Sequence, residues 1–164
     1  MKRTIPRCLA VAAVAAACLY YALDTSSASP PATRAIATPA PSVTGLDPAL
    51  RRALARAKIA AKRDGITIRI TSGYRTPAYQ RKLLDEAIAR YGSERIARQY
   101  VNTPERSTHV KGLAVDIGPT DAAYWMIQHG AEFGLCQIYA NEVWHFERVV
   151  RPGGACPPPL ADAS

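Results

Sequence analysis

Two short segments hold residue types that could together bind a metal ion and activate a water molecule. The first contains His109 followed by Asp116, and the second contains Glu142 followed by His145. Imidazole nitrogen and carboxylate oxygen are common zinc ligands, and catalytic zinc sites use three protein ligands and leave a fourth position for water. A glutamate close to such a site can move protons. The pattern therefore predicts a metallohydrolase in which His109, Asp116 and His145 bind zinc and Glu142 is the general base.

An enzyme built on this site would also need a cation for the charge that develops on its substrate. The pKa of water bound to zinc falls to about 7. Glu142 would take the proton while water attacks a carbonyl group, and would then pass it to the leaving amine. Zinc and a nearby cation would stabilise the oxyanion. Arg75, in the turn after the first expected strand, is the candidate for this cation.

Taken singly, each of these residues also has an ordinary structural explanation. A histidine on a strand is usually structural, and Asp116 could cap a turn, so that only the two motifs together favour a site. Glu147 shares the expected strand face of His145 and could support that ligand through a hydrogen bond. The favoured interpretation of Glu147 is nevertheless a solvated carboxylate at a strand end. His129 has no surrounding motif and is assigned to the surface.

The elements that must position the site follow from hydrophobic periodicity and capping signals. Asp47 and Pro48 are typical of a helix start, which predicts a helix over 48–63. Apolar and polar residues alternate over 66–72, which predicts a strand. Further helices are expected over 77–91, 93–101 and 120–134, and further strands over 113–117, 135–139 and 143–149. The pattern predicts an α+β fold in which a small, mostly antiparallel sheet carries the site and helices flank it.

Composition divides the chain into four parts. Residues 1–28 have a basic start, an apolar run and small residues at a plausible cleavage point, as in a secretory signal peptide. An uncleaved membrane anchor and lipidation at Cys18 are the alternatives. Residues 29–46 are rich in Pro, Ala, Ser and Thr and are interpreted as a linker. A single domain is expected over 47–151 and a Gly- and Pro-rich tail over 152–164.

Export of the chain would favour a disulfide bond. Two cysteines, Cys136 and Cys156, remain after removal of the signal peptide. An exported domain with an even number of cysteines can pair them. We expect a bond between Cys136 and Cys156 that ties the tail to the domain. The alternative is a pair of reduced thiols, with Cys136 buried in a strand.

The basic composition bears on the partners of the protein. The formal net charge is +8, and the cations are spread over the expected helices without interleaved aromatic residues. This distribution disfavours nucleic acid as a partner. For an exported protein it favours an anionic surface, such as a cell wall or membrane headgroups.

Three motifs carry a resemblance to a known family. They read SGYRT at 72–76 with Gln80 following, STHVKGLAVD at 107–116, and EVWH at 142–145. In type, spacing and order they resemble the motifs of the VanY-type zinc D-alanyl-D-alanine carboxypeptidases. The resemblance extends from about residue 66 to residue 147, which is nearly the whole expected domain.

The resemblance implies a fold of the Hedgehog/DD-peptidase type, zinc as the cofactor, and a role for each matched residue. His109, Asp116 and His145 would be the ligands, and Glu142 would be the base. Arg75 would polarise the scissile carbonyl. The residues expected to bind or shape the substrate are Ser107 and Gln80, which would hold its terminal carboxylate, together with Tyr74 and Trp144.

The substrate implied is the peptide stem of peptidoglycan, cut at its C-terminal D-alanine by a monomer in the periplasm, cell envelope or extracellular space. Membrane contact would involve only an uncleaved or lipidated N-terminal segment. A wall endopeptidase, an L,D-carboxypeptidase or a D,D-dipeptidase on the same scaffold is an alternative. A non-catalytic wall-binding module with a structural zinc is a more remote one, because closed structural sites usually have four protein ligands.

Overall fold

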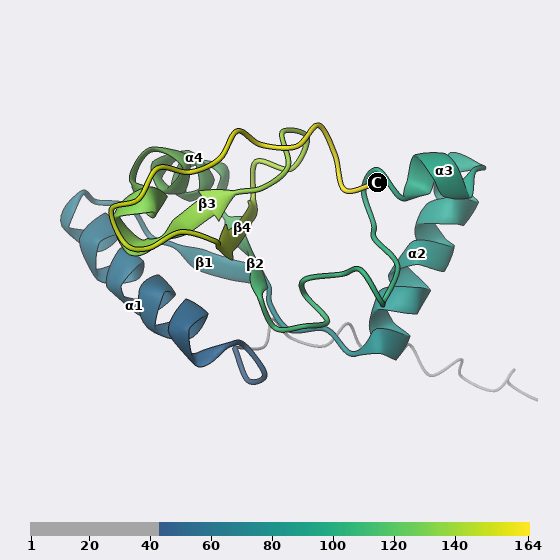
Figure 1. Cartoon of the computed structure of the whole chain (residues 1–164), viewed down its shortest axis with the longest axis horizontal. Coiled ribbons are helices and arrows are strands. Elements are labelled where there is room, and N and C mark those ends of the chain that lie inside the picture. The colour runs from purple at the N-terminus through teal and green to yellow at the C-terminus, as the bar shows by residue number, and fades with distance from the viewer. Residues whose placement is uncertain (1–42) are drawn as a thin grey trace, which may run out of the picture. The chain divides into compact units, whose positions relative to one another are not determined.

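The computed structural model describes residues 43–164, and it contains the small antiparallel sheet that the sequence predicts (Figure 1). The expected signal peptide and most of the expected linker lie outside the described residues. The four strands are β1 (Arg69–Ser72), β2 (Ala114–Gly118), β3 (Leu135–Gln137) and β4 (His145–Arg148). They are arranged in the order β1-β2-β4-β3, and every neighbouring pair is antiparallel. The expected α+β class is therefore confirmed.

The helices divide between the two faces of this sheet. They are α1 (Pro48–Arg63), α2 (Pro77–Tyr91), α3 (Glu94–Ala97) and α4 (Thr120–His129), the last continued by a 3-10 turn, η1 (Gly130–Phe133). Helices α1 and α4 pack with Val115, Ile117 and Phe146 in the main hydrophobic core. Because side chains alternate across a strand, Asp116 and His145 face the other way. Helices α2 and α3 stand on that second side (Figure 1).

The start of α1 shows why the capping residues Asp47 and Pro48 predicted this helix correctly. The Asp47 carboxylate accepts hydrogen bonds from the backbone N–H groups of Ala49 and Leu50 at 2.8 and 2.9 Å. Pro48 needs no such acceptor because it lacks an N–H. The buried residues of the helix are Leu50, Ala53, Leu54, Ala57 and Ala61. Leu46, at the end of the expected linker, is also buried in this core, so packing begins before the expected boundary.

Several elements are shorter than the sequence predicts. The strand expected over 66–72 begins only at Arg69, because the Ile66 N–H is still bonded to the Ala61 carbonyl at the end of α1. The helix expected over 93–101 ends at Ala97 and continues as a turn. The helix expected over 120–134 ends at His129 before η1. The strand expected over 143–149 begins at His145, whose N–H closes a turn onto the Glu142 carbonyl.

The tail over 152–164 contains no helix or strand, as expected, but it is packed on the domain. The disulfide between Cys136 and Cys156 is present, which confirms the expected pairing. Leu160 forms a parallel bridge with Tyr139, and Ala163 is buried. No helix among the described residues is long and apolar enough to cross a membrane.

Candidate metal centre and its pocket

The strand register brings two of the three expected ligands together. Asp116 on β2 is paired with His145 on β4, so their side chains leave the same face of the sheet side by side. His109 lies in the turn that leads into β2. Its carbonyl accepts from the N–H groups of Arg75, at 3.2 Å, and Gly112, at 3.1 Å, which fixes this turn against the end of β1.

The ligand atoms form a small and nearly equilateral triangle. His109 Nε2 lies 3.3 Å from His145 Nδ1, and Asp116 Oδ1 lies 3.2 and 3.3 Å from these two nitrogens. A tetrahedral ion with ligands at about 2.0–2.1 Å would hold them about 3.3–3.4 Å apart. Asp116 Oδ1 is buried and forms no hydrogen bond within the described part of the chain. The donor set and its spacing therefore fit zinc.

The other ring nitrogen of each histidine has its own acceptor. His109 Nδ1 lies 2.8 Å from the Gly73 carbonyl oxygen, and His145 Nε2 lies 3.0 Å from Glu147 Oε1. An acceptor on one ring nitrogen leaves the opposite nitrogen free to bind a metal. Glu147 is only 9% exposed, so its interpretation as a solvated carboxylate is wrong. It lies on the His145 face beside Ala114, whose small side chain leaves room for it.

Arg75 ties the metal site to the neighbouring helix. Its Nη2 donates to Asp116 Oδ2 at 2.8 Å, its Nη1 to Gln80 Oε1 at 3.2 Å, and its Nε to Ser72 Oγ at 2.9 Å. Burial alone would raise the pKa of Asp116, but the His109 and His145 rings beside it hold that pKa well below its usual range. Asp116 is therefore ionised, as a metal ligand must be.

Glu142 lies in the same pocket, next to His145. Its Oε2 lies 3.8 Å from His145 Nδ1, while its Oε1 is buried and has no hydrogen-bond partner among the described residues. Burial raises the pKa of Glu142 to about 7, and Asp116 adds to this effect while His145 and Arg75 oppose it. A carboxylate with a pKa near neutrality can both accept and return a proton.

These side chains open into one pocket of about 240 Å³ between the sheet and α2. The three expected ligands line it together with Glu142, Arg75, Ser107, Gln80 and Trp144. Tyr74 does not line it and packs against the main core. Gln80 is 1% exposed, and its Nε2 donates to the Asn102 carbonyl at 2.8 Å, so both ends of its amide are already engaged. His129 pairs with Glu132 on the surface, as expected.

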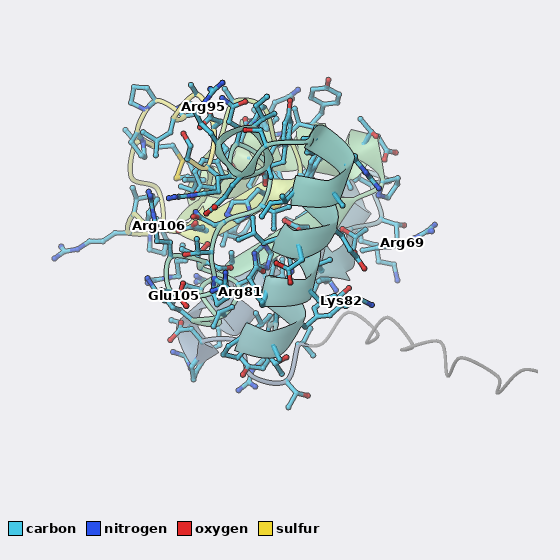
Figure 2. All side chains as sticks on the ribbon, turned by 90° about the vertical axis from the view of Figure 1, so that its right-hand side faces the viewer. Arg69, Arg81, Lys82, Arg95, Glu105 and Arg106 are labelled. Carbon is cyan, nitrogen blue, oxygen red and sulfur yellow. A yellow bond between two sulfur atoms is a disulfide. The ribbon has the colours of Figure 1, made fainter. Side chains whose placement is uncertain are left out.

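Arg75 is the only arginine or lysine among the described residues that line the pocket. The other basic residues on this side lie outside it. Figure 2 looks onto α2 and shows Arg81 next to Glu105, to which it is paired at 3.5 Å. Arg95 and Arg106 are also exposed on this view. An anionic group that enters the pocket therefore meets Arg75.

The residues that line the pocket but were not among the expected site residues are Leu83, Tyr100, Val101, Asn102, Thr108, Tyr139 and Ala163. The ring centroids of Tyr139 and His145 lie 5.0 Å apart, and Asn102 and Ala163, which are joined by a hydrogen bond, also line the pocket. Tyr139 and Asn102 flank the expected motifs, and their polar side chains at the ends of regular elements were the available signal. Ala163 offered none, because an alanine in a Pro-rich tail has no distinguishing chemistry.

Comparison with known proteins gives a family match over this same region. The model of the family described as VanY: D-alanyl-D-alanine carboxypeptidase matches residues 44–150, more than half of the chain. A D-alanyl-D-alanine carboxypeptidase of Enterococcus faecalis is 30% identical, over 55% of this chain and 43% of that protein. The chain thus spans less than half the length of this curated relative.

Two solved structures are similar in both sequence and fold. One is a mutant of the vancomycin resistance D,D-pentapeptidase VanY in complex with Zn(II). It is 28% identical, covers 66% of this chain and 73% of its own, and has a TM-score of 0.58. The other is VanYB in complex with D-alanine-D-alanine, which is 27% identical, covers 62% of this chain and 70% of its own, and has a TM-score of 0.59.

Proposed function

We propose that this chain, which belongs to the VanY family of D-alanyl-D-alanine carboxypeptidases, is an exported zinc peptidase that removes the C-terminal D-alanine from peptidoglycan stem peptides. The observation that carries the proposal is the triangle formed by His109 Nε2, His145 Nδ1 and Asp116 Oδ1, with edges of 3.2–3.3 Å. It faces a pocket that also holds a base and a cation. The Zn(II) complex and the D-alanine-D-alanine complex among the similar structures support the same metal and substrate.

Zinc held by the three ligands would supply a Lewis acid and lower the pKa of bound water to about 7. Glu142 would accept a proton from the attacking water through Oε1, which is buried and has no hydrogen-bond partner among the described residues. It would then return that proton to the amine that leaves. Arg75 would stabilise the oxyanion, because its guanidinium is fixed by Asp116 and Gln80 before the substrate arrives.

The pocket also indicates which end of a peptide enters it. The terminal carboxylate of a stem peptide needs a positive environment and hydrogen-bond donors. The Gln80 amide, which accepts a hydrogen bond from Arg75, keeps one N–H that is not used in the bond to Asn102. Ser107, 4% exposed, is also part of the pocket lining and would be a second donor. Trp144, which is 43% exposed and also lines the pocket, would contact the preceding part of the peptide.

Export is part of the proposal, because peptidoglycan lies outside the cytoplasm. The basic and apolar composition of residues 1–28 supports it, as does the disulfide, which persists in oxidising compartments. The test is expression of the full chain in a bacterial host. A mass corresponding to cleavage near Ala28 in the envelope or secreted fraction is expected, and a full-length protein in the cytoplasm would contradict export.

The activity is tested by mass spectrometry of stem pentapeptides incubated with the zinc-loaded protein. Loss of one terminal alanine is expected, and a chelator should abolish it. Glu142→Ala should lower kcat by about 10²–10⁴-fold while zinc stays bound. Glu105→Ala, at an exposed glutamate outside the pocket lining, is the matched control.

The products decide between related activities. Loss of a dipeptide, cleavage of an internal bond or action on tetrapeptides alone would still indicate a zinc peptidase. Its specificity would then be that of a dipeptidase, an endopeptidase or an L,D-carboxypeptidase. No cleavage of any stem peptide or intact wall by folded, zinc-loaded protein would contradict an enzymatic function and favour a wall-binding module.

A further inference from the structure

The last part of the tail crosses from the sheet to the α3 side of the pocket. Figure 1 shows this trace, in yellow, passing over β3 and ending beside α3. We call residues 157–164 the strap. It starts next to the disulfide that joins Cys156 to Cys136 on β3. Leu160 then donates to the Ile138 carbonyl at 2.8 Å and accepts from the Ala140 N–H at 2.7 Å, so the strap is fixed to the loop that leads to Glu142.

The far end of the strap is fixed to the opposite side of the pocket. The Ala163 carbonyl accepts from Asn102 Nδ2 at 2.9 Å, and the Ala163 N–H donates to the Gln99 carbonyl at 3.4 Å. Ala163 is only 6% exposed and is part of the pocket lining. The strap is therefore attached at Leu160 and at Ala163 and begins next to the disulfide, which describes a fixed wall rather than a mobile lid.

A continuous series of hydrogen bonds connects this wall to the metal site. Asn102 donates to Ala163 through its side chain and accepts from Gln80 Nε2 through its carbonyl. Gln80 Oε1 in turn accepts from Arg75 Nη1, and Arg75 Nη2 donates to Asp116. The strap thus lies directly behind the residues that face the carboxylate end of the pocket.

We propose that the strap closes the carboxylate end of the pocket and thereby restricts the enzyme to the last residue of a peptide. This inference rests on the proposed function. Ala163 and Asn102 place backbone and an amide where a longer substrate would have to continue beyond the cleaved bond. A chain that ends after one residue fits in front of this wall, and a chain that continues would have to displace it.

The test compares two synthetic peptides, one ending in D-Ala-D-Ala and one extended by a glycine after the last alanine. The variant ends at Leu160, which keeps the disulfide and the Leu160 bonds but removes Ala163. The ratio of kcat/KM for the extended peptide to that for the shorter peptide should rise by about tenfold or more. KM for the shorter peptide should also rise, with a smaller change in kcat.

Two further proteins make the result unambiguous. Ser164→Ala is the control, because Ser164 is exposed and its side chain, within residues 43–164, bonds only to Asp162. Asn102→Leu keeps the full length but removes the bond to Ala163, so it should change the ratio in the same direction even if the shortened chain folds poorly. Bound zinc and an unchanged unfolding midpoint identify the variants that are folded.

The outcomes separate this inference from the function on which it rests. If the full chain already cleaves both peptides equally, or if both variants keep the original ratio within about twofold, the strap does not set the specificity, although the peptidase stands. If the full chain, loaded with zinc, cleaves neither peptide, the proposed function fails and the inference fails with it.

Discussion

The two histidines proposed as zinc ligands each have an acceptor beside their other ring nitrogen. His145 Nε2 is held at 3.0 Å by Glu147, a carboxylate that is itself buried. This contact orients the ring and makes Nδ1 more basic, which strengthens its bond to a metal. We expect Glu147→Ala to weaken zinc binding by about 10–100-fold, as measured by competition with a chromophoric chelator.

The control for this prediction is Glu132→Ala. Glu132 makes a similar contact, at 3.1 Å, with the surface histidine His129, so the same chemical change is made away from the site. Its zinc affinity should equal that of the unchanged protein. Glu147→Gln, which can still accept a hydrogen bond from the ring, should fall between the two. Equal affinities for all three variants would mean that Glu147 does not support the ligand.

The charge on His145 makes zinc binding dependent on pH. Burial would lower the pKa of His145, but Asp116 and Glu147 outweigh it and raise that pKa to about 9 in the metal-free chain. Near neutral pH the ring is therefore protonated, and this proton must leave before Nδ1 can bind a metal. Because protons compete with zinc, the apparent affinity should rise with pH, by up to about tenfold per unit, until pH approaches about 9.

Calorimetry at neutral pH, in buffers with different heats of ionisation, measures this proton directly. About one proton from His145 should be released for each zinc bound. His129→Gln should leave the proton release unchanged, because His129 lies on the surface beside Glu132. A zinc affinity that stays constant over the acidic and neutral range would contradict the raised pKa.

For individual residues, the sequence was most informative where a side chain can bind a metal ion, transfer a proton or carry a charge. The grouping of His109, Asp116 and His145 with Glu142 and Arg75 in one pocket could be predicted, because few other roles bring those residue types together at that spacing. The assignment of Glu147 failed because exposure is not encoded locally: it depends on β3 and on Ala114 lying opposite. Gln80 was expected to hold substrate, and its internal bonds to Arg75 and Asn102 could not be foreseen from its type.

At the scale of the elements, the turn before β2 requires a glycine at position 112. Gly112 has a φ of +71°, and a Cβ there would contact the Gly45 carbonyl oxygen. Its carbonyl also accepts from the Asp47 N–H at the start of α1. Gly112→Ala should therefore lower the free energy of unfolding by about 1–3 kcal/mol or more, and should disturb His109 in the same turn. Chemical denaturation and zinc affinity are the measurements.

A second glycine, Gly65, separates the effect of the positive φ from the effect of the contact with Gly45. Gly65 has a similar φ of +77°, but nothing lies within 4 Å of a Cβ built on it. Gly65→Ala should thus show the cost of the backbone conformation alone, with zinc binding intact. A loss of stability at Gly112 no greater than that at Gly65 would show that the approach of Gly45 is relieved by a shift of the chain.

The elements were predictable where their ends are determined by neighbouring residues. Asp47 and Pro48 define the start of α1 by themselves, and Thr76 with Pro77 does the same for α2. The start of β4 was placed too early because a turn onto the Glu142 carbonyl replaces the expected pairing there. Periodicity predicts which residues are extended, whereas strand ends depend on a partner that is distant in sequence.

For the molecule as a whole, the packing of the strap against the domain could not be predicted from the sequence, and the reason is physical. Leu160 and Ala163 are fixed through their backbone groups, which every residue type possesses. Only the pairing of Cys136 with Cys156 could be expected, because two cysteines in a domain that is expected to be exported have few alternatives. That bond is therefore the one sequence-visible sign that the tail belongs to the domain.

The disulfide provides the last prediction, because it joins the tail to β3 across a sequence separation of 20 residues. Closing a loop of this size restricts the unfolded chain and stabilises the folded state by about 3 kcal/mol. The double variant Cys136→Ser, Cys156→Ser should lose about this much in urea unfolding. A reductant should lower the midpoint of the unchanged protein and have no effect on the variant.

Zinc binding distinguishes the two roles that the bond could have. The ligands lie on β2, on β4 and in the turn before β2, and the disulfide is bonded to none of them, so the folded double variant should bind zinc as tightly as before. Its KM for a D-Ala-D-Ala peptide should rise, since Ala163 then depends on its hydrogen bonds alone. A loss of zinc affinity without a change in KM would show instead that the bond supports the sheet and that the tail contributes nothing to the pocket.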